Sequence, residues 1–223
     1  AISVEDMGTD INDISLTTTG TISLNGTYTT SILSSGNADV GDVTLTGPVT
    51  LAGNTTIDTD SSNGTVGFTS TVDGGNTLTI SSGSGAVDFA GNIGATTALG
   101  DVTINSSSGT GTIDIEQIGD GDNAGGIIGT VAIGNTTTTQ VEFDGTIYKF
   151  GQVTAETDTV TIKSTDTDEA IDFTAGAAVT ITGVGQDIAG LNTTAGPAIT
   201  FDTGTIMLAN TCLLYTSPSP RDT

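Results

Sequence analysis

Pairs of apolar residues separated by a single residue recur along the chain at nearly regular intervals. Alternation of apolar and polar residues over such short runs is typical of a β-strand with one buried face. Self-similarity at a period of 20–50 residues indicates a repeat array rather than one globular core. In the clearest series the steps are 21, 26, 28, 30 and 28 residues. Its members are Val66-x-Phe68, Val87-x-Phe89, Ile113-x-Ile115, Val141-x-Phe143, Ile171-x-Phe173 and Ile199-x-Phe201.

A second series of apolar pairs is interleaved with the first. Gly, Asn, Ser and Asp separate the pairs and favour tight turns, whereas the abundant Thr, Val and Ile favour strands. The chain is therefore predicted to be all-β, with equivalent pairs of successive repeats stacked on one another. The members of the second series are Leu78-x-Ile80, Val102-x-Ile104, Val131-x-Ile133, Val160-x-Ile162, Val179-x-Ile181 and Ile206-x-Leu208.

A repeat of this length is too short to bury its own apolar face, so neighbouring repeats must stack to form a continuous core. We therefore predict a single-stranded parallel β-solenoid of about eight coils over residues 1–211, of the right-handed β-helix type. The alternative fold is a β-sandwich, which also shows short strands at regular spacing. A net charge of −23 with 4% aromatic residues is also compatible with disorder, but the regular placement of apolar residues opposes it.

Residues 212–223 differ in composition from the rest of the chain. They contain the only Cys and the only Arg, and residues 212–222 resemble a translated sequencing adapter. We interpret them as a non-native, disordered tail, and residues 1–211 as a fragment of a longer protein. Without the tail the chain has 25 acidic residues (26 less Asp222) and two basic ones (three less Arg221), so its net charge remains −23.

This composition narrows the classes of function. The strong negative charge argues against binding to nucleic acid or insertion into an anionic membrane, since both would be repelled. Outside the tail there is no cysteine for a disulfide or a metal thiolate. The chain has no histidine, and outside the tail its only basic residues are Lys149 and Lys163. We therefore expect that the protein is not an enzyme and requires no cofactor.

The acidic residues within the first series suggest one candidate site. The residue between two inward-pointing residues of a strand points outward. Asp88, Asp114, Glu142 and Asp172 occupy this position in four consecutive repeats, so stacking would place them about 4.8 Å apart. Such carboxylates repel by about 1 kcal/mol per pair in water, and a calcium ion could bridge them. The sequence thus predicts a calcium stripe, with a plain solvated surface as the alternative.

The second series predicts a different surface. Its middle residues are mostly threonine and would form a second outward stripe. Flat threonine ladders on a β-solenoid can match an ice lattice, so an ice-binding β-solenoid is one alternative function. A polysaccharide-active β-helix enzyme is another. The middle residues are Thr79, Thr103, Ala132, Thr161, Thr180 and Met207.

Residues 43–57, 68–80 and 87–94 resemble the repeats of filamentous-haemagglutinin-like adhesins, which are large secreted bacterial surface proteins exported by two-partner or autotransporter routes. The likeness covers roughly residues 40–210. It implies a β-helical shaft located at the bacterial cell surface, with a role in adhesion or matrix contact. The partners implied are host or neighbouring cell surfaces, glycans or further copies of the chain. The resemblance carries over no catalytic residue.

Overall fold

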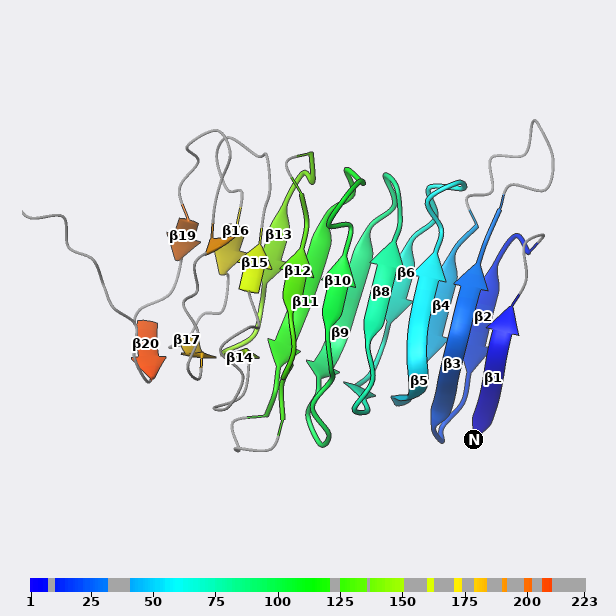
Figure 1. The fold of residues 1–223 in the computed structure, drawn as a ribbon, viewed down its shortest axis with the longest axis horizontal. Helices are drawn as coiled ribbons and strands as arrows, with labels where there is room; N and C mark the ends of the chain where they lie inside the picture. Colours follow the sequence, from blue (N-terminus) through cyan, green and yellow to red (C-terminus); the bar gives the residue numbers. More distant parts are fainter. Residues whose placement is uncertain are drawn as a thin grey trace, which may run out of the picture.

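The computed structural model describes residues 1–7, 11–31, 41–120, 125–135 and 137–150, together with the backbone of six further short strands. No helix occurs in these residues, and every strand pairing is parallel. Successive strands wind into stacked coils along the long axis of the molecule (Figure 1). The predicted parallel β-solenoid is confirmed. The alternative β-sandwich is wrong, because equivalent strands pair side by side in parallel instead of facing one another as antiparallel layers.

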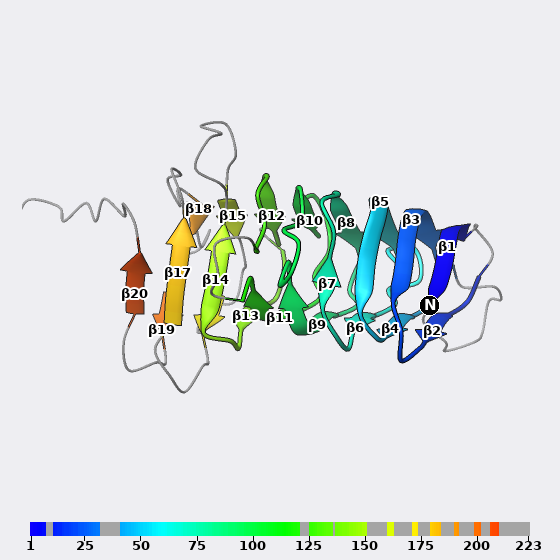
Figure 2. The same ribbon diagram turned by 90° about the horizontal axis from the view of Figure 1, so that it is seen from below.

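Each coil contributes strands to three faces, two of which lie on opposite sides of the core in the view of Figure 2. The first, named here the acidic face, contains the first predicted series of apolar pairs. It is formed by β2 (Ile14–Thr17), β4 (Val43–Thr46), β6 (Val66–Phe68), the first halves of β9 (Val87–Ile93) and β11 (Ile113–Ile118), β13 (Val141–Phe143), β16 (Ile171–Phe173) and β19 (Ile199–Phe201).

The chain next passes through the middle face and then the threonine face. The middle face is formed by β1 (Ile2–Met7), the first halves of β3 (Ile22–Thr29) and β5 (Val49–Asp58), β7 (Val72–Asp73), the ends of β9 and β11, β14 (Ile147–Phe150), β17 (Val179–Gly183) and β20 (Ile206–Ala209). The threonine face is formed by the ends of β1, β3 and β5, followed by β8 (Leu78–Ser81), β10 (Val102–Ile104), β12 (Val131–Ile133), β15 (Val160–Ile162) and β18 (Gly190–Leu191).

Two details of the sequence prediction need correction. About five turns are described in full, against the eight coils expected, and the short strands up to β20 continue the three faces beyond them. The second apolar series is also not a single column. Its first four members lie on the threonine face, but Val179–Gly183 pairs with β14 and Ile206–Ala209 with β17, which places both on the middle face.

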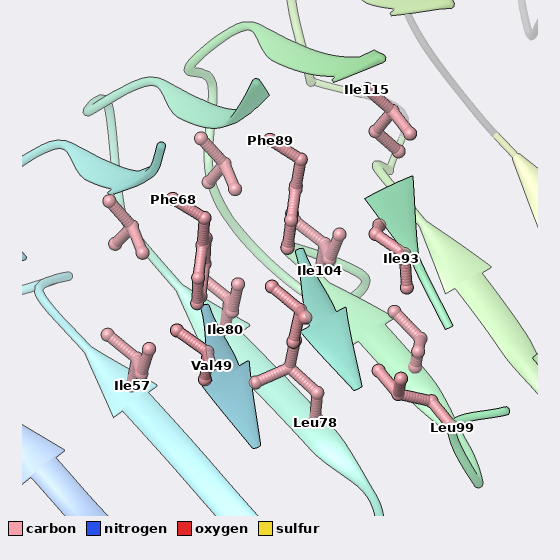
Figure 3. Close-up of a cluster of buried hydrophobic side chains, with 14 of the residues drawn as sticks. Val49, Ile57, Phe68, Leu78, Ile80, Phe89, Ile93, Leu99, Ile104 and Ile115 are labelled. Carbon is pink, nitrogen blue, oxygen red and sulfur yellow. The ribbon is translucent and has the colours of Figure 1, made fainter. Parts of the chain in front are cut away.

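The core is a narrow column of apolar side chains from all three faces. The apolar pairs are buried and the residues between them are partly or fully exposed, as in β6, β8 and β10. Identical residues stack in register: the rings of Phe68 and Phe89 lie parallel with centroids 4.5 Å apart, as Figure 3 shows. Each buried side chain of this size contributes roughly 1.5–3 kcal/mol to folding. Coil stacking therefore stabilises the fold without a conventional globular core.

Hydrogen bonds from side chains tie successive coils together at the corners. In each of these bonds, called clasps here, an Asp or Asn of one coil accepts the backbone N–H of a residue in the next coil. In the five clasps named below a glycine precedes the donor, and at Gly26, Gly83 and Gly129 the acceptor side chain occupies the space that a Cβ would fill. A Cβ on Gly129, for example, would lie 2.2 Å from Oδ1 of Asp101. The clasps join Asp6 to Thr27, Asp13 to Asp42, Asp42 to Thr65, Asn63 to Ser84 and Asp101 to Thr130.

One corner contains a column of glycines, formed by Gly41, Gly64, Gly85 and Gly111. A Cβ on Gly64 would lie 2.0 Å from the carbonyl oxygen of Gly41, and one on Gly85 would lie 2.1 Å from that of Gly64. The same contact on Gly111 would be 1.9 Å from the oxygen of Gly85. No side chain fits at these distances. The glycines therefore set how closely successive coils approach at this corner.

The same corner also buries polar side chains, and these hydrogen-bond from coil to coil. The Oδ1 of Asn105 accepts the backbone N–H of Ser82 at 2.8 Å, and its amide nitrogen donates to Oγ of Ser82 at 2.9 Å. In the next coil, the amide nitrogen of Asn135 donates to the carbonyl oxygen of Asn105 at 2.6 Å. Buried polar groups are tolerated when they are paired in this way.

Candidate functional site: the acidic face

The four predicted calcium ligands occupy one register position on the acidic face. Asp88 pairs with Asp114, Asp114 with Glu142, and Glu142 with Asp172. The predicted alignment of these residues is therefore observed in the backbone. The side chain of Asp172 lies outside the described residues. The column is carboxylate-bearing only in its later coils, because its earlier members are Ser15, Thr44 and Gly67.

A second row of carboxylates lies beside this column. Glu116 follows the inward-pointing Ile115 in β11, and Asp144 follows Phe143 in β13. The N–H of Asp144 donates to the carbonyl oxygen of Ile115 at 3.1 Å, so the parallel ladder continues to this point. With Asp88, Asp114 and Glu142, the two rows place five described carboxylates on three consecutive coils. Asp202, which the sequence would add to the second row, lies outside the described residues.

The crowding of these carboxylates perturbs their proton affinity. Partial burial and, after it, the negative charges of Asp144, Asp88 and Glu116 together raise the pKa of the Asp114 carboxyl to about 6. Partial desolvation, followed by the charge of Asp144, also raises the pKa of Asp88. Both causes disfavour the ionised form. Asp114, in the middle of the patch, therefore titrates close to neutral pH.

No lysine or arginine belongs to the acidic face among its described residues. Lys149, the one basic residue whose side chain is described, is on β14 of the middle face and is 8% exposed. Its stem lies against a glycine-lined corner, where Cβ atoms placed on Gly119 and Gly126 would be 3.3 and 3.0 Å from the Cβ of Lys149. Because of this position, Lys149 does not share the acidic face with the carboxylates.

The described part of the chain contains no group of three or more Asp, Glu or Cys side chains arranged to hold one metal ion. A chelating cage of protein ligands is therefore not formed by these residues. Calcium normally takes six to eight oxygen ligands, so an ion on the acidic face would bridge two neighbouring carboxylates and keep most of its water. The calcium stripe stays a prediction.

The threonine face has its own regular column of outward residues. Thr27, Thr56, Thr79 and Thr103 follow one another in register. Ala132, Thr161 and Gly190 continue the column. Two predicted members are wrong: Thr180 is in register with Ile147, and Met207 with Thr180, on the middle face. The uninterrupted run of threonines is therefore four coils long and lies at the N-terminal part of the face.

The sequence prediction missed the structural role of many aspartates. It assigned no role to Asp13, Asp42 and Asp101, yet each accepts a backbone N–H of the following coil at 2.7–2.9 Å. A signal was present in the sequence. The clasped residue, which directly follows a Gly, occurs 29, 23 and 29 residues after these three aspartates, and this separation is about the length of one repeat.

Comparison of the chain with protein-family models, curated proteins and solved structures found no match. Over the described residues, no helix has the length and apolarity needed to cross a membrane.

Proposed function

We propose that this chain is a structural segment of the shaft of a secreted bacterial cell-surface adhesin, and that it acts mechanically rather than catalytically. The stacked coils would serve as a stiff spacer. The faces of the rod, or domains beyond it, would contact host or neighbouring cell surfaces, glycans or other copies. The resemblance of residues 43–57, 68–80 and 87–94 to filamentous-haemagglutinin-like repeats supports the adhesin part of the proposal.

The observation that carries the mechanical part is the continuous parallel pairing of the coils. The acidic face is paired strand by strand from β2 to β19, and the same holds for the middle face from β1 to β20. Buried apolar residues line this stack throughout the part whose side chains are described. In such an array each coil contacts only its neighbours, so a pulling force along the chain is resisted by one coil interface after another.

Single-molecule force spectroscopy on the whole chain, held by handles at its two ends, tests this proposal. Coils should peel off sequentially, each releasing about 27 residues, or roughly 90 Å of contour at about 3.3–3.6 Å per residue. Rupture of the whole chain in one event, as in a compact globular domain, would contradict a shaft role.

Display of the chain on bacteria, followed by binding to glycan-coated and cell-coated surfaces, tests the adhesive part. Absence of binding above that of bare bacteria would remove that part only.

Ice binding is a second candidate function, and the column Thr27, Thr56, Thr79 and Thr103 favours it. These outward residues stand on adjacent parallel strands, about 4.8 Å apart, as a repeating lattice requires. Thermal hysteresis and crystal shaping by the purified chain would support this function. Ice growth unchanged from that in buffer would dispose of it. The matched variant is Thr79→Lys, which interrupts the threonine column with a lysine at an outward-pointing position.

A further inference from the structure

The chain contains two Asn–Gly pairs, Asn25–Gly26 and Asn63–Gly64, and each is followed by a threonine. Both asparagines are exposed at corners of the solenoid. Strand β3, which contains Asn25, pairs with β1 on one side and with β5 on the other, so the exposure of Asn25 does not arise from an end of the stack. Because glycine has no side chain, its backbone nitrogen is easily approached. Each pair is therefore a candidate for chemical modification.

The modification is a spontaneous deamidation that needs only water. The backbone nitrogen of the glycine attacks Cγ of the asparagine, so a new C–N bond forms and the bond from Cγ to Nδ2 breaks. The side-chain nitrogen leaves as ammonia and takes up the proton that the glycine N–H gives up. Water then opens the resulting cyclic imide at either of its carbonyl carbons, which yields aspartate or isoaspartate. The rate depends on how freely Cγ can approach the glycine nitrogen.

The side chain of Asn25 is not held at its corner. A Cβ on Gly53 would lie 1.9 Å from its Oδ1, so the side chain lies over a glycine of the next coil. Within the described residues, no hydrogen bond involves its side-chain amide. Its backbone N–H donates to the hydroxyl of Tyr28 at 3.1 Å, and that hydroxyl donates to the carbonyl oxygen of Val4. The register of β3 with β1 and with β5 also shifts here, so the ladder is irregular around Asn25.

Asn63, in contrast, is held in two ways. Its Oδ1 accepts the N–H of Ser84 at 2.9 Å in one of the clasps. The N–H of Gly64, which would supply the attacking nitrogen, donates to the carbonyl oxygen of Thr59 at 3.3 Å. The clasp must open before Cγ can turn toward Gly64, and the net free energy of one hydrogen bond corresponds to an open population reduced about tenfold. We propose that Asn25 is a site of spontaneous deamidation in the folded chain, and that the clasp protects Asn63 from the same reaction.

Deamidation of Asn25 changes a corner that is already acidic. Asn25 is in register with the exposed Glu5, and Asp6 accepts the N–H of Thr27 beside it. Aspartate at this position adds a like charge next to these two carboxylates. Isoaspartate also lengthens the main chain by one carbon, which disturbs the pairing of β3 with its neighbours. The modification therefore weakens one defined coil interface as the protein ages.

Mass spectrometry of the whole chain after incubation measures the reaction at both sites. The folded protein is kept in a mildly alkaline buffer and digested at intervals, and its peptides are examined for the mass change from amide to acid. Asn25 should react at least about tenfold faster than Asn63. In denaturant the two rates should become similar, because both sites contain Asn-Gly-Thr. Similar rates in the folded protein, faster reaction at Asn63, or an unreactive Asn25 would overturn the proposal.

The variant Ser84→Pro tests the protective clasp, with Ser84→Thr as its matched control. Proline removes the N–H that donates to Asn63, so reaction at Asn63 should become about tenfold faster, whereas the rate at Asn25 should not change. An unchanged rate at Asn63 would refute protection by the clasp. If the proline variant fails to fold, the ratio of the two rates in the folded and the denatured natural chain decides the same point.

Discussion

At the scale of single residues, Asp114 carries the clearest energetic consequence. Its pKa of about 6 lies above the value of about 3.9 for an unfolded aspartate, so the folded state binds more protons between these pH values. Stability should therefore fall as pH rises from about 4 to 7. Because the side chain is partly solvated, we expect the loss to be about 1 kcal/mol. Denaturant unfolding at a series of pH values measures it.

The variant Asp114→Asn isolates this effect. It removes the negative charge but keeps a similar shape, so it should raise the unfolding free energy at pH 7.5 by about 1 kcal/mol and flatten its pH dependence. Glu5→Gln, which neutralises an exposed carboxylate on β1, is the control and should leave the slope in place. A steep slope in the Asp114 variant, equal to that of the wild type, would show that crowding at this residue is unimportant.

The glycine column gives a second prediction at this scale. Gly85→Ala would place a Cβ 2.1 Å from the carbonyl oxygen of Gly64, a backbone atom that the stacked coils hold in place. We expect a loss of about 3 kcal/mol in stability, at the upper end for overpacking. Gly75→Ala is the matched control, because its Cβ would meet nothing within 4 Å. Thermal melting of the two variants should differ clearly, and equal melting temperatures would contradict the close approach of the coils.

At the scale of elements, the apolar pairs predicted the strands well but not the number of faces. In the described residues each pair of the Val66–Phe68 series follows a turn or bend, so its period and its outward residues could be read directly. The middle face was hidden, because β5 and β9 run around a corner as single strands, Val49–Asp58 and Val87–Ile93. Val179 was assigned to the wrong column, although the 19-residue step before it is shorter than every other step in both series.

The clasps and the titration of Asp114 lay beyond the sequence for a different reason. Both depend on which residues of neighbouring coils face one another, and the spacing between coils varies from 21 to 29 residues among the clasps. A one-residue error in this spacing moves a side chain to the opposite side of its strand. Hydrophobic periodicity tolerates such an error at a corner, whereas a hydrogen bond of 2.7–2.9 Å does not.

The clasps lead to a prediction at the scale of the element. Asp101 joins the turn before β10 to Thr130 in the turn before β12 through a bond of 2.8 Å. Asp101→Ala should destabilise the protein by about 1.5 kcal/mol, since an N–H at the corner loses its charged acceptor. Asp101→Asn keeps an oxygen acceptor and should lose about 0.5 kcal/mol or less. Chemical denaturation compares the two, and a similar loss in both would mean that charge, not hydrogen bonding, is what matters here.

At the scale of the whole molecule, stability is spread along one dimension. Each coil is held by its two neighbours through apolar stacking, glycine contacts and clasps, so no single coil is a nucleus for the rest. Negative charge is distributed along the same axis and acts against every interface. Screening or neutralising that charge should therefore strengthen the whole stack. A comparison of the stabilisation by different salts separates general screening from calcium binding.

The predicted calcium stripe can be tested at this scale. Suppose that a calcium ion bridges neighbouring carboxylates such as Asp114 and Glu142. Millimolar CaCl₂, at a concentration about ten times the Kd for calcium, should then raise the melting temperature of chelator-treated protein by about 4 °C. The comparison is with NaCl at the same ionic strength, which screens repulsion without bridging. Glu142→Gln should abolish the part specific to calcium but keep the response to NaCl. Equal shifts with both salts would reduce the acidic face to a solvated surface, because screening alone would then account for the stabilisation.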